Sequence, residues 1–260
     1  MQPYERNASA FGTGFARTAA QVDEGLRAFM LGVYNHMVLG LAISAVVALA
    51  LNMAATTADP AGAVARAGSI YLTEFGRLLY VSPLKWVIAL APLAFIFVFS
   101  LRLERMSAAA ARLTFFAFAA VMGASLSTLL LVFTGASVVQ VFFITAASFG
   151  ALSLWGYTTR RSLSGLGSFL IMGLIGLILA SLVNLFVASS ALQFAISIVG
   201  VLIFAGLTAY DTQKLKEMYL HGNYDGEAAA KVSIFGALTL YLDFINMFQF
   251  LLALVGNRNE

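Results

Sequence analysis

The sequence predicts an all-α polytopic membrane protein with seven transmembrane helices, and three observations lead to this fold class. Hydrophobic residues make up 61% of the 260 residues and charged residues only 10%, against roughly 45–50% and 25% in soluble domains. Uncharged stretches recur that are long enough to cross a bilayer. Lysine and arginine are unevenly divided among the segments that connect these stretches. The chain therefore has too little polar surface for a water-soluble protein, and lipid must be its main solvent.

The first 28 residues are polar and of mixed charge, and we expect residues 1–28 to form a tail in the cytoplasm. They lack the apolar stretch of a secretory signal. Residues 28–58 contain no Asp, Glu, Lys or Arg. They predict the first span at about 29–53, which is too long for the core of a cleaved signal and is expected to stay in the membrane.

Lys85 and Arg102 bracket the second predicted span. Pro92 lies inside it and is expected to kink the helix, which a membrane helix tolerates when neighbours satisfy the freed carbonyl. A long outer loop precedes this span. Its segment "IYLTEFGRLLYV" (70–81) predicts a helix that lies at the membrane interface.

Two longer uncharged stretches, residues 113–159 and 162–210, each predict a pair of spans. The breaks are expected near "TGAS" (134–137) and "ASSA" (188–191), where small polar residues allow a turn. A last span closes a seven-helix transmembrane domain at 29–255. The seven predicted spans are 29–53, 85–102, 113–134, 137–156, 166–188, 192–213 and 233–255, and a short C-terminal tail follows at 256–260.

The distribution of basic residues predicts the orientation of the chain. With the N-terminus inside, eleven of the fifteen Lys and Arg residues fall on the cytoplasmic side. The other four, Arg66, Arg77, Lys85 and Arg258, fall outside. This bias follows the positive-inside rule and predicts a cytoplasmic N-terminus and an external C-terminus. A six-span arrangement would place the C-terminus inside and would have to exclude one segment, most naturally the last, because it carries an acid.

Two acids lie within apolar runs. Asp211 ends the run in "FAGLTAYDTQKLK" (204–216), and Asp243 lies within "LTLYLDFINMFQFLLALVG" (238–256). An ionisable residue in a span is costly and usually faces the bundle interior or a water-filled path. The sixth and seventh spans are consecutive, so we expect them to be antiparallel neighbours whose acids meet near the cytoplasmic side. Their depths match only if the sixth helix continues past Lys214.

Two carboxyl groups in contact away from water share one proton and release their protons in separate steps. Such a pair senses pH. When both groups are ionised, Asp211 and Asp243 offer hard oxygen ligands suited to Ca²⁺. Arg102 or Arg105, at the cytoplasmic end of the second span, could close over the pair instead. Two alternatives stay open: each acid makes a structural hydrogen bond only, or Asp211 is an interfacial charge beside Lys214.

The remaining polar residues indicate no enzyme. His36 is expected to pack with one hydrogen bond, and without cysteine a transition-metal site is improbable. Neither a zinc hydrolase motif, a nucleophile elbow nor a phosphate-binding loop is present. No stripe of basic residues interleaved with aromatics suggests nucleic acid as a partner. We therefore expect a protein that is not an enzyme, has no cofactor and has the lipid bilayer as its main partner.

Several segments resemble the Bax inhibitor-1 family, and its bacterial branch in particular. The two that carry the acids are the most specific. The resemblance runs from about residue 25 to 256. The matching segments are "VYNHMVLGLAISAVVA" (33–48), "FFITAASFGALSLWGYTTRRSLSGLGSFLIMGLIGL" (142–177), "FAGLTAYDTQKLKEMY" (204–219) and "TLYLDFINMFQFLL" (239–252).

The resemblance implies two three-helix layers around a central C-terminal helix, in a bacterial inner membrane. It also implies a pH-sensitive passive calcium leak gated by a di-aspartyl proton sensor, with Ca²⁺ as the transported ion. Asp211 and Asp243 match the sensor positions. An arginine of the second helix would latch onto the pair, and Arg102 is the candidate, with Arg105 as the alternative. Calcium ions and protons would then be the partners of the site.

Two other functions were weighed from the sequence. Some bacterial members of the family bind and restrain a membrane-embedded AAA protease, which implies a non-conducting regulator. In that case deletion of residues 1–24 would abolish inhibition and spare ion flux. A secondary transporter would predict an inverted repeat, but residues 113–159 and 162–210 show no convincing similarity to each other.

Overall fold

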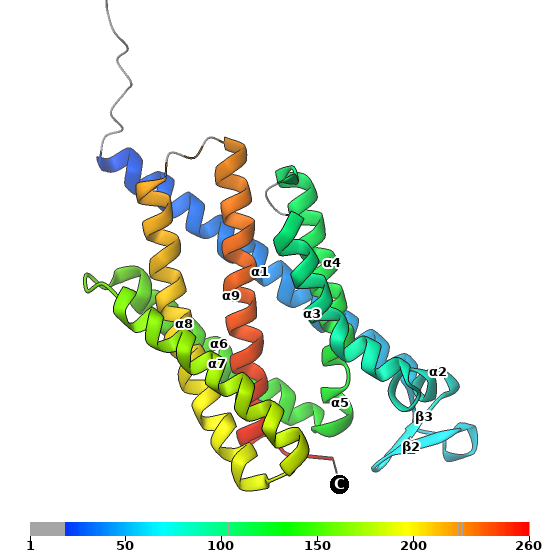
Figure 1. Ribbon diagram of the computed structural model, residues 1–260. Helices are drawn as coiled ribbons and strands as arrows, with labels where there is room; N and C mark the ends of the chain where they lie inside the picture. The colour runs from blue at the N-terminus through cyan, green and yellow to red at the C-terminus, as the bar shows by residue number, and fades with distance from the viewer. Residues whose placement is uncertain (1–18, 103–104, 223, 225, 260) are drawn as a thin grey trace, which may run out of the picture.

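A computed structural model describes residues 19–102, 105–222, 224 and 226–259. Most of the predicted cytoplasmic tail, including residues 1–18 of the segment 1–24 whose deletion is expected to abolish protease inhibition, therefore lies outside the described residues. Helices make up most of the described chain (Figure 1). They are α1 (Ala19–Ala55), α2 (Glu74–Gly76), α3 (Leu84–Arg102), α4 (Ala108–Leu126), α5 (Leu129–Val132), α6 (Gly135–Thr158), α7 (Ser164–Val187), α8 (Ser190–His221) and α9 (Gly226–Val255).

Among the described residues, six helices are long and apolar enough to cross a membrane. A seventh span results if Glu74–Val81 and Leu84–Phe99, which are bent by 59° at their junction, count as one. The prediction of an all-α polytopic membrane protein is confirmed at this level. Helix α1 is 37 residues long, or about 55 Å, and it runs diagonally behind the other helices in Figure 1. It is longer than the ~30 Å hydrocarbon core, so it is long enough to cross a bilayer and extend beyond it.

The predicted breaks inside the two long uncharged stretches are confirmed. Thr134 caps the N-terminus of α6, and its side chain accepts a hydrogen bond from the Ser137 N–H. Between α7 and α8, Ala188 adopts a left-handed conformation with φ of 51°, and Ser189 caps α8. Small polar side chains thus satisfy the first N–H groups of each new helix.

The prediction of one interfacial helix over residues 70–81 is wrong in its first part. Ile70–Leu72 forms β3, the central strand of a three-stranded antiparallel sheet with β1 (Thr56–Thr57) and β2 (Ala65–Ala67). Gly68, with φ of 60°, lies in the turn between β2 and β3. Helical structure begins only after Thr73, whose side chain caps α2, and a single π-helical turn then spans Arg77–Val81. Residues 70–72 therefore form a strand that pairs with β1, which directly follows α1, although their amphipathic pattern predicted a helix.

Helix α9 lies at the centre of the bundle and packs against α1, α4, α6 and α8 (Figure 1). Its buried stripe includes Leu240, Tyr241 and Leu252, each fully buried. Two rings from α4, Phe115 and Phe118, contact the Tyr241 ring edge-on, with centroids 5.7 and 5.9 Å away. The aromatic cluster fixes the contact between the last helix and α4.

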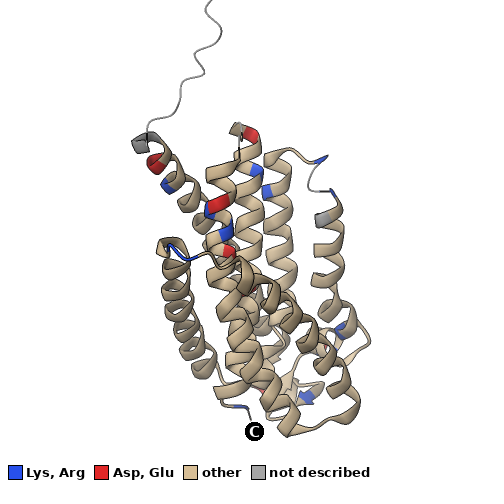
Figure 2. Cartoon of the chain, turned by 60° about the vertical axis from the view of Figure 1, so that its left-hand side comes forward, with Lys and Arg blue, Asp and Glu red and all other residues tan. Residues whose placement is uncertain are grey.

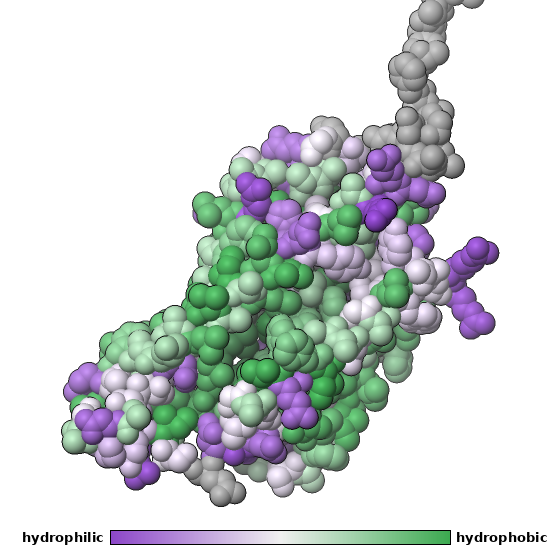
Figure 3. All heavy atoms as spheres, turned by 180° about the vertical axis from the view of Figure 1, so that it is seen from behind, coloured by the Kyte–Doolittle hydropathy of each residue, from purple (hydrophilic) through white to green (hydrophobic). Residues whose placement is uncertain are grey.

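The outer surface of the bundle is apolar. Phe186 is 89% exposed and Leu185 76% exposed, which would be unfavourable in water but suits contact with lipid. Hydrophobic residues form a broad band around the middle of the face in Figure 3, with hydrophilic residues toward the two ends. Charged residues are likewise concentrated toward the ends of the bundle in Figure 2. Both patterns are those of a chain embedded in a bilayer.

Candidate functional site

The two acids singled out in the sequence lie on α8 and α9, which pack side by side. Helix α8 continues to His221, well past Lys214, as the depth argument requires. The helix ends there because Gly222 takes an extended conformation at its C-terminus. The extra turns bring Asp211 away from the helix end and to the level of Asp243.

The carboxyl groups of Asp211 and Asp243 lie close enough together to interact directly. Asp243 is only 4% exposed, and its Oδ2 is buried without a hydrogen-bond partner. Asp211 is partly buried. A buried oxygen without a donor is costly, so this pair of carboxyls is a position at which a proton or a cation would be stabilised.

Both acids line an open cavity of about 730 Å³ between α3, α7, α8 and α9. Most of the lining is apolar, including Leu93 and Ile96 from α3. The polar lining residues are Ser181, Tyr210, Asp211, Lys214, Thr239, Asp243 and Asn246. The polar groups from α8 and α9 therefore share one wall of an otherwise mostly apolar cavity.

Lys214 is the only basic residue among those that line the cavity. It lies one turn after Asp211, close enough for an electrostatic interaction with it, and its Nζ is 5.9 Å from the Tyr210 ring centroid. Lys214 is itself exposed, and the aromatic face and the acid both attract its ammonium group. The alternative that Asp211 is an interfacial charge beside Lys214 stays open, because the structure places this exposed lysine beside the acid.

The structure does not bring Arg102 or Arg105 to the acids. Both side chains are exposed, neither lines the cavity, and neither forms an ion pair with a described residue. Residues 103 and 104 between them lie outside the described chain. The arginine latch stays a prediction, and Lys214 is the cation that accompanies the pair in this conformation.

A chain of hydroxyl groups, which the sequence interpretation missed, fixes the rotation of α8 beside Asp211. The Tyr34 hydroxyl lies 2.6 Å from Ser153 Oγ, which lies 2.8 Å from Thr212 Oγ1. Thr212 donates to the Thr208 carbonyl oxygen at 2.7 Å. Because the Thr212 proton is used there, Ser153 donates to Thr212, and Tyr34 donates to Ser153. The chain ties α1 and α6 to α8, and its one sequence signal is hydroxyl residues within apolar helices.

A second missed contact fixes α9 near Asp243. Tyr241 is fully buried, and its hydroxyl lies 2.6 Å from Ser44 Oγ. Ser44 donates to the Ala119 carbonyl oxygen at 2.7 Å, so Tyr241 is the donor to Ser44. These two hydrogen bonds join α1, α4 and α9 and hold α9 in the rotation that directs Asp243 toward the cavity.

The donor set suits a weakly held cation. The described residues contain no cluster of three or more His, Cys, Asp or Glu residues that could hold a metal ion. Ca²⁺ takes six to eight oxygen ligands, and the two carboxylates supply at most four of them. Water and the nearby Thr239 and Asn246 oxygens would have to supply the rest. Such a site is expected to bind the ion weakly and to release it readily.

His36 takes no part in this site. Its Nδ1 lies 2.7 Å from the Gly32 carbonyl oxygen, and its ring stacks against Phe116 with centroids 6.3 Å apart. The prediction that His36 packs with one hydrogen bond is confirmed.

These features define a class: a polytopic helical membrane protein with a buried carboxyl pair contributed by its last two long helices. The chain belongs to the Bax inhibitor-1 family, because the family model described as "Inhibitor of apoptosis-promoting Bax1" matches residues 26–260. The resemblance inferred from the acid-bearing motifs is therefore confirmed.

Relatives from diverse bacteria match over nearly their full length. The chain is 44% identical to an uncharacterized protein of Caulobacter vibrioides, over 96% of this chain and 99% of that one. It is 43% identical to the inner membrane protein YbhL of Escherichia coli, over 92% and 95% of the two chains. An uncharacterized membrane protein of Streptococcus pyogenes is 34% identical over 92% and 96%.

Proposed function

We propose that this chain is a pH-sensitive passive leak channel for Ca²⁺, with Asp211 and Asp243 as its proton sensor and cation site. The observation that carries the proposal is the close approach of the two carboxyls at the wall of the α3–α7–α8–α9 cavity. Two ionised carboxylates have only acceptor oxygens and cannot form a hydrogen bond with each other. A hydrogen bond between them would need a proton, so the interaction between α8 and α9 at this position is expected to depend on pH.

Loss of that proton would leave two negative charges that repel each other in a mostly apolar cavity. A divalent cation relieves that repulsion, and the apolar remainder of the cavity offers it no competing ligand. Protonation and cation entry thus exclude each other at one position. Nothing in this scheme needs a cofactor or a covalent step, so we propose that the protein is not an enzyme and that Ca²⁺ is its cargo.

The proposal includes a topology. The E. coli relative is named an inner membrane protein, and we place this chain in the corresponding bacterial membrane. The bent segment from Glu74 to Phe99 serves as the second of seven spans, so that six helices in two layers of three surround α9. The positive-inside rule then places the N-terminus in the cytoplasm and the C-terminus outside.

The first prediction is that replacing either acid abolishes the pH dependence of calcium flux. The native protein in proteoliposomes with an enclosed calcium indicator is expected to change its flux between pH 6 and 8. Asp211→Asn and Asp243→Asn are each expected to give a constant flux over this range, because an amide carries no titrating proton. Asp59→Asn, at an exposed loop acid, is the matched control and should retain the native profile. A native-like pH profile in both cavity variants would refute the sensor.

A further inference from the structure

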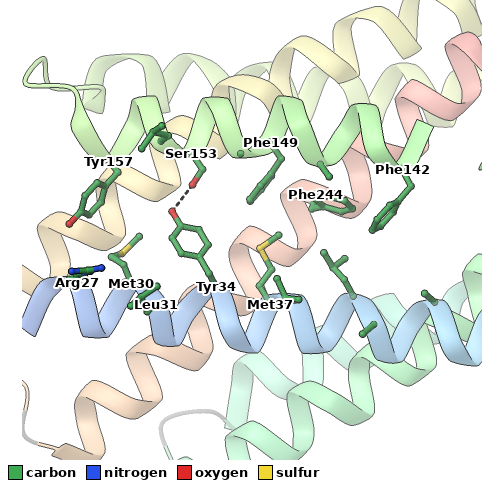
Figure 4. Close-up of a pocket in the computed structure, with 17 residues that line it drawn as sticks. Arg27, Met30, Leu31, Tyr34, Met37, Phe142, Phe149, Ser153, Tyr157 and Phe244 are labelled. Atoms are coloured by element: carbon green, nitrogen blue, oxygen red, sulfur yellow. Dashed lines mark hydrogen bonds between the residues drawn. The ribbon is translucent and has the colours of Figure 1, made fainter. Parts of the chain in front are cut away.

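A second groove, lined by other faces of the bundle, runs between α1 and α6 (Figure 4). Its volume is about 620 Å³. It adjoins a further cavity of about 500 Å³, and the two share Leu41, Ala45, Phe142 and Phe244 in their linings. The two adjoining apolar cavities follow the contact between α1 and α6 and reach α9 at Phe244.

The groove has one polar end, and the rest of its lining is mostly apolar. Arg27 and Tyr157 lie across from each other at one end in Figure 4. Lys216 contacts Tyr157, with its Nζ 2.8 Å from the Tyr157 carbonyl oxygen and 5.3 Å from the ring centroid. Beyond this end the lining is almost entirely apolar and includes Met30 and Met37, whose flexible side chains adapt to irregular ligands.

The charge at the polar end is not neutralised within the described chain. Arg27 is exposed and forms no ion pair with a described residue. A single unpaired guanidinium at the mouth of an apolar groove is complementary to an anionic head group joined to a hydrocarbon chain. Arginine binds phosphate particularly well, because its planar fork of donors matches two phosphate oxygens.

The groove also has the length for such a ligand. From Arg27 to Ala45 it follows about 18 residues of α1, or ~27 Å along the helix. The acyl chains of one leaflet cover about half of the ~30 Å hydrocarbon core. A chain that starts from a phosphate at Arg27 therefore fits within the groove. The bilayer around the protein supplies this ligand at high local concentration.

We propose that the α1–α6 groove is a binding site for an anionic phospholipid, with the phosphate at Arg27 and one acyl chain along Met30, Met37 and Phe149. The hydrogen bond between Tyr34 and Ser153 spans the groove (Figure 4) and holds its walls at a fixed distance. The groove shares no lining residue with the cavity of the two acids, so lipid retention and calcium flux can be measured as separate properties.

Gly150 offers a way to block the groove without disturbing the fold. It lines the groove, and a Cβ at this position would meet no atom within 4 Å. Gly176 on α7 is equally open and lines none of the described cavities. The same substitution at the two glycines therefore separates filling of the groove from the addition of bulk to a lipid-facing helix.

The test is native mass spectrometry of the full chain in detergent, titrated with phosphatidylglycerol or phosphatidylcholine. The native protein is expected to retain one phosphatidylglycerol in preference to phosphatidylcholine. Gly150→Phe, and the smaller Gly150→Leu, are expected to lose this retention, whereas Gly176→Phe keeps it. Arg27→Gln is expected to lower the affinity for phosphatidylglycerol about fivefold, as for the loss of one basic residue near a lipid surface. Arg112→Gln, at an exposed arginine of α4, is its control.

Thermal unfolding midpoints show whether each variant is folded. Retention by folded Gly150→Leu at the native level would overturn the site. If the native protein retains both lipids equally, and Arg27→Gln does not change that retention, the assignment of the head group is overturned. Dimers that Gly150→Phe dissociates, with lipid retention unchanged, would assign the groove to a second copy of this chain and would also overturn the proposal.

Discussion

Asp211 and Thr212 are neighbours in α8, yet their side chains serve different contacts. Asp211 lines the cavity beside Asp243, whereas Thr212 is buried against Ser153 of α6. Adjacent residues in a helix are rotated by about 100°, so the hydroxyl contact on one side sets the direction of the carboxyl on the other. The position of the acid therefore depends on a residue with no charge.

Thr212→Val is expected to destabilise the protein by about 1–3 kcal/mol, because it leaves the buried Ser153 hydroxyl without its acceptor while preserving volume. The measurement is thermal or denaturant unfolding in detergent. Thr158→Val is the matched control, since Thr158 is exposed and bonds only to its own helix. A stability equal to that of the control would show that the hydroxyl chain does not hold α8 in place.

Lys214 and the two candidate arginines can be compared directly. Lys214→Gln removes the positive charge beside Asp211 and is expected to shift the pH midpoint of calcium flux. Arg102→Gln and Arg105→Gln remove exposed charges outside the cavity and are expected to shift it less. Flux in proteoliposomes measures all three. A larger shift for an arginine variant would mean that the latch operates in a conformation other than this one.

At the scale of helices, the site depends on how closely α6 approaches α8. Gly156 is buried at this contact, and a Cβ there would clash with the Ala209 carbonyl oxygen. A backbone atom cannot move aside as a side chain can, so only glycine allows this distance. The approach also places Ser153, one turn earlier in α6, within hydrogen-bonding distance of Thr212.

Gly156→Ala is accordingly expected to separate the two helices and to cost about 1–3 kcal/mol through overpacking. Gly150→Ala, in the same helix, meets open space and is expected to be neutral or slightly stabilising, because alanine favours helix. Unfolding midpoints of the two variants provide the comparison. Equal midpoints would contradict the close approach.

The sequence predicts where the helices lie along the chain better than it predicts how they contact one another. Uncharged stretches and small polar residues at 134–137 and 188–191 were sufficient to locate spans and breaks. The two acids were conspicuous because charge is rare in such a chain. The β-sheet was missed because its strands are only two or three residues long and gain their stability from pairing. The partners of Tyr34 and Ser44 could not be predicted, since they depend on helix rotation, which periodicity does not fix in a chain that is apolar on all sides.

For the molecule as a whole, the number of spans decides which surfaces face the cytoplasm. The chain has no cysteine, so single cysteines report on sidedness without interference. With seven spans, Asp23→Cys and Ser162→Cys are expected to react with a membrane-impermeant maleimide on the cytoplasmic side, and Ser190→Cys on the other. All three residues are exposed. If the bent segment from Glu74 to Phe99 does not cross, the residue 23 and residue 162 probes will react on opposite sides.

The central position of α9 has a consequence for biosynthesis. The ribosome releases this helix after α1, α4, α6 and α8, all of which pack against it. The earlier helices thus enter the lipid before their common neighbour exists, and Ser44 has no phenol to meet until residue 241 has been translated. Insertion and assembly are separated in time, and a nascent chain halted before Gly226 leaves its inward faces uncovered for membrane quality control to detect.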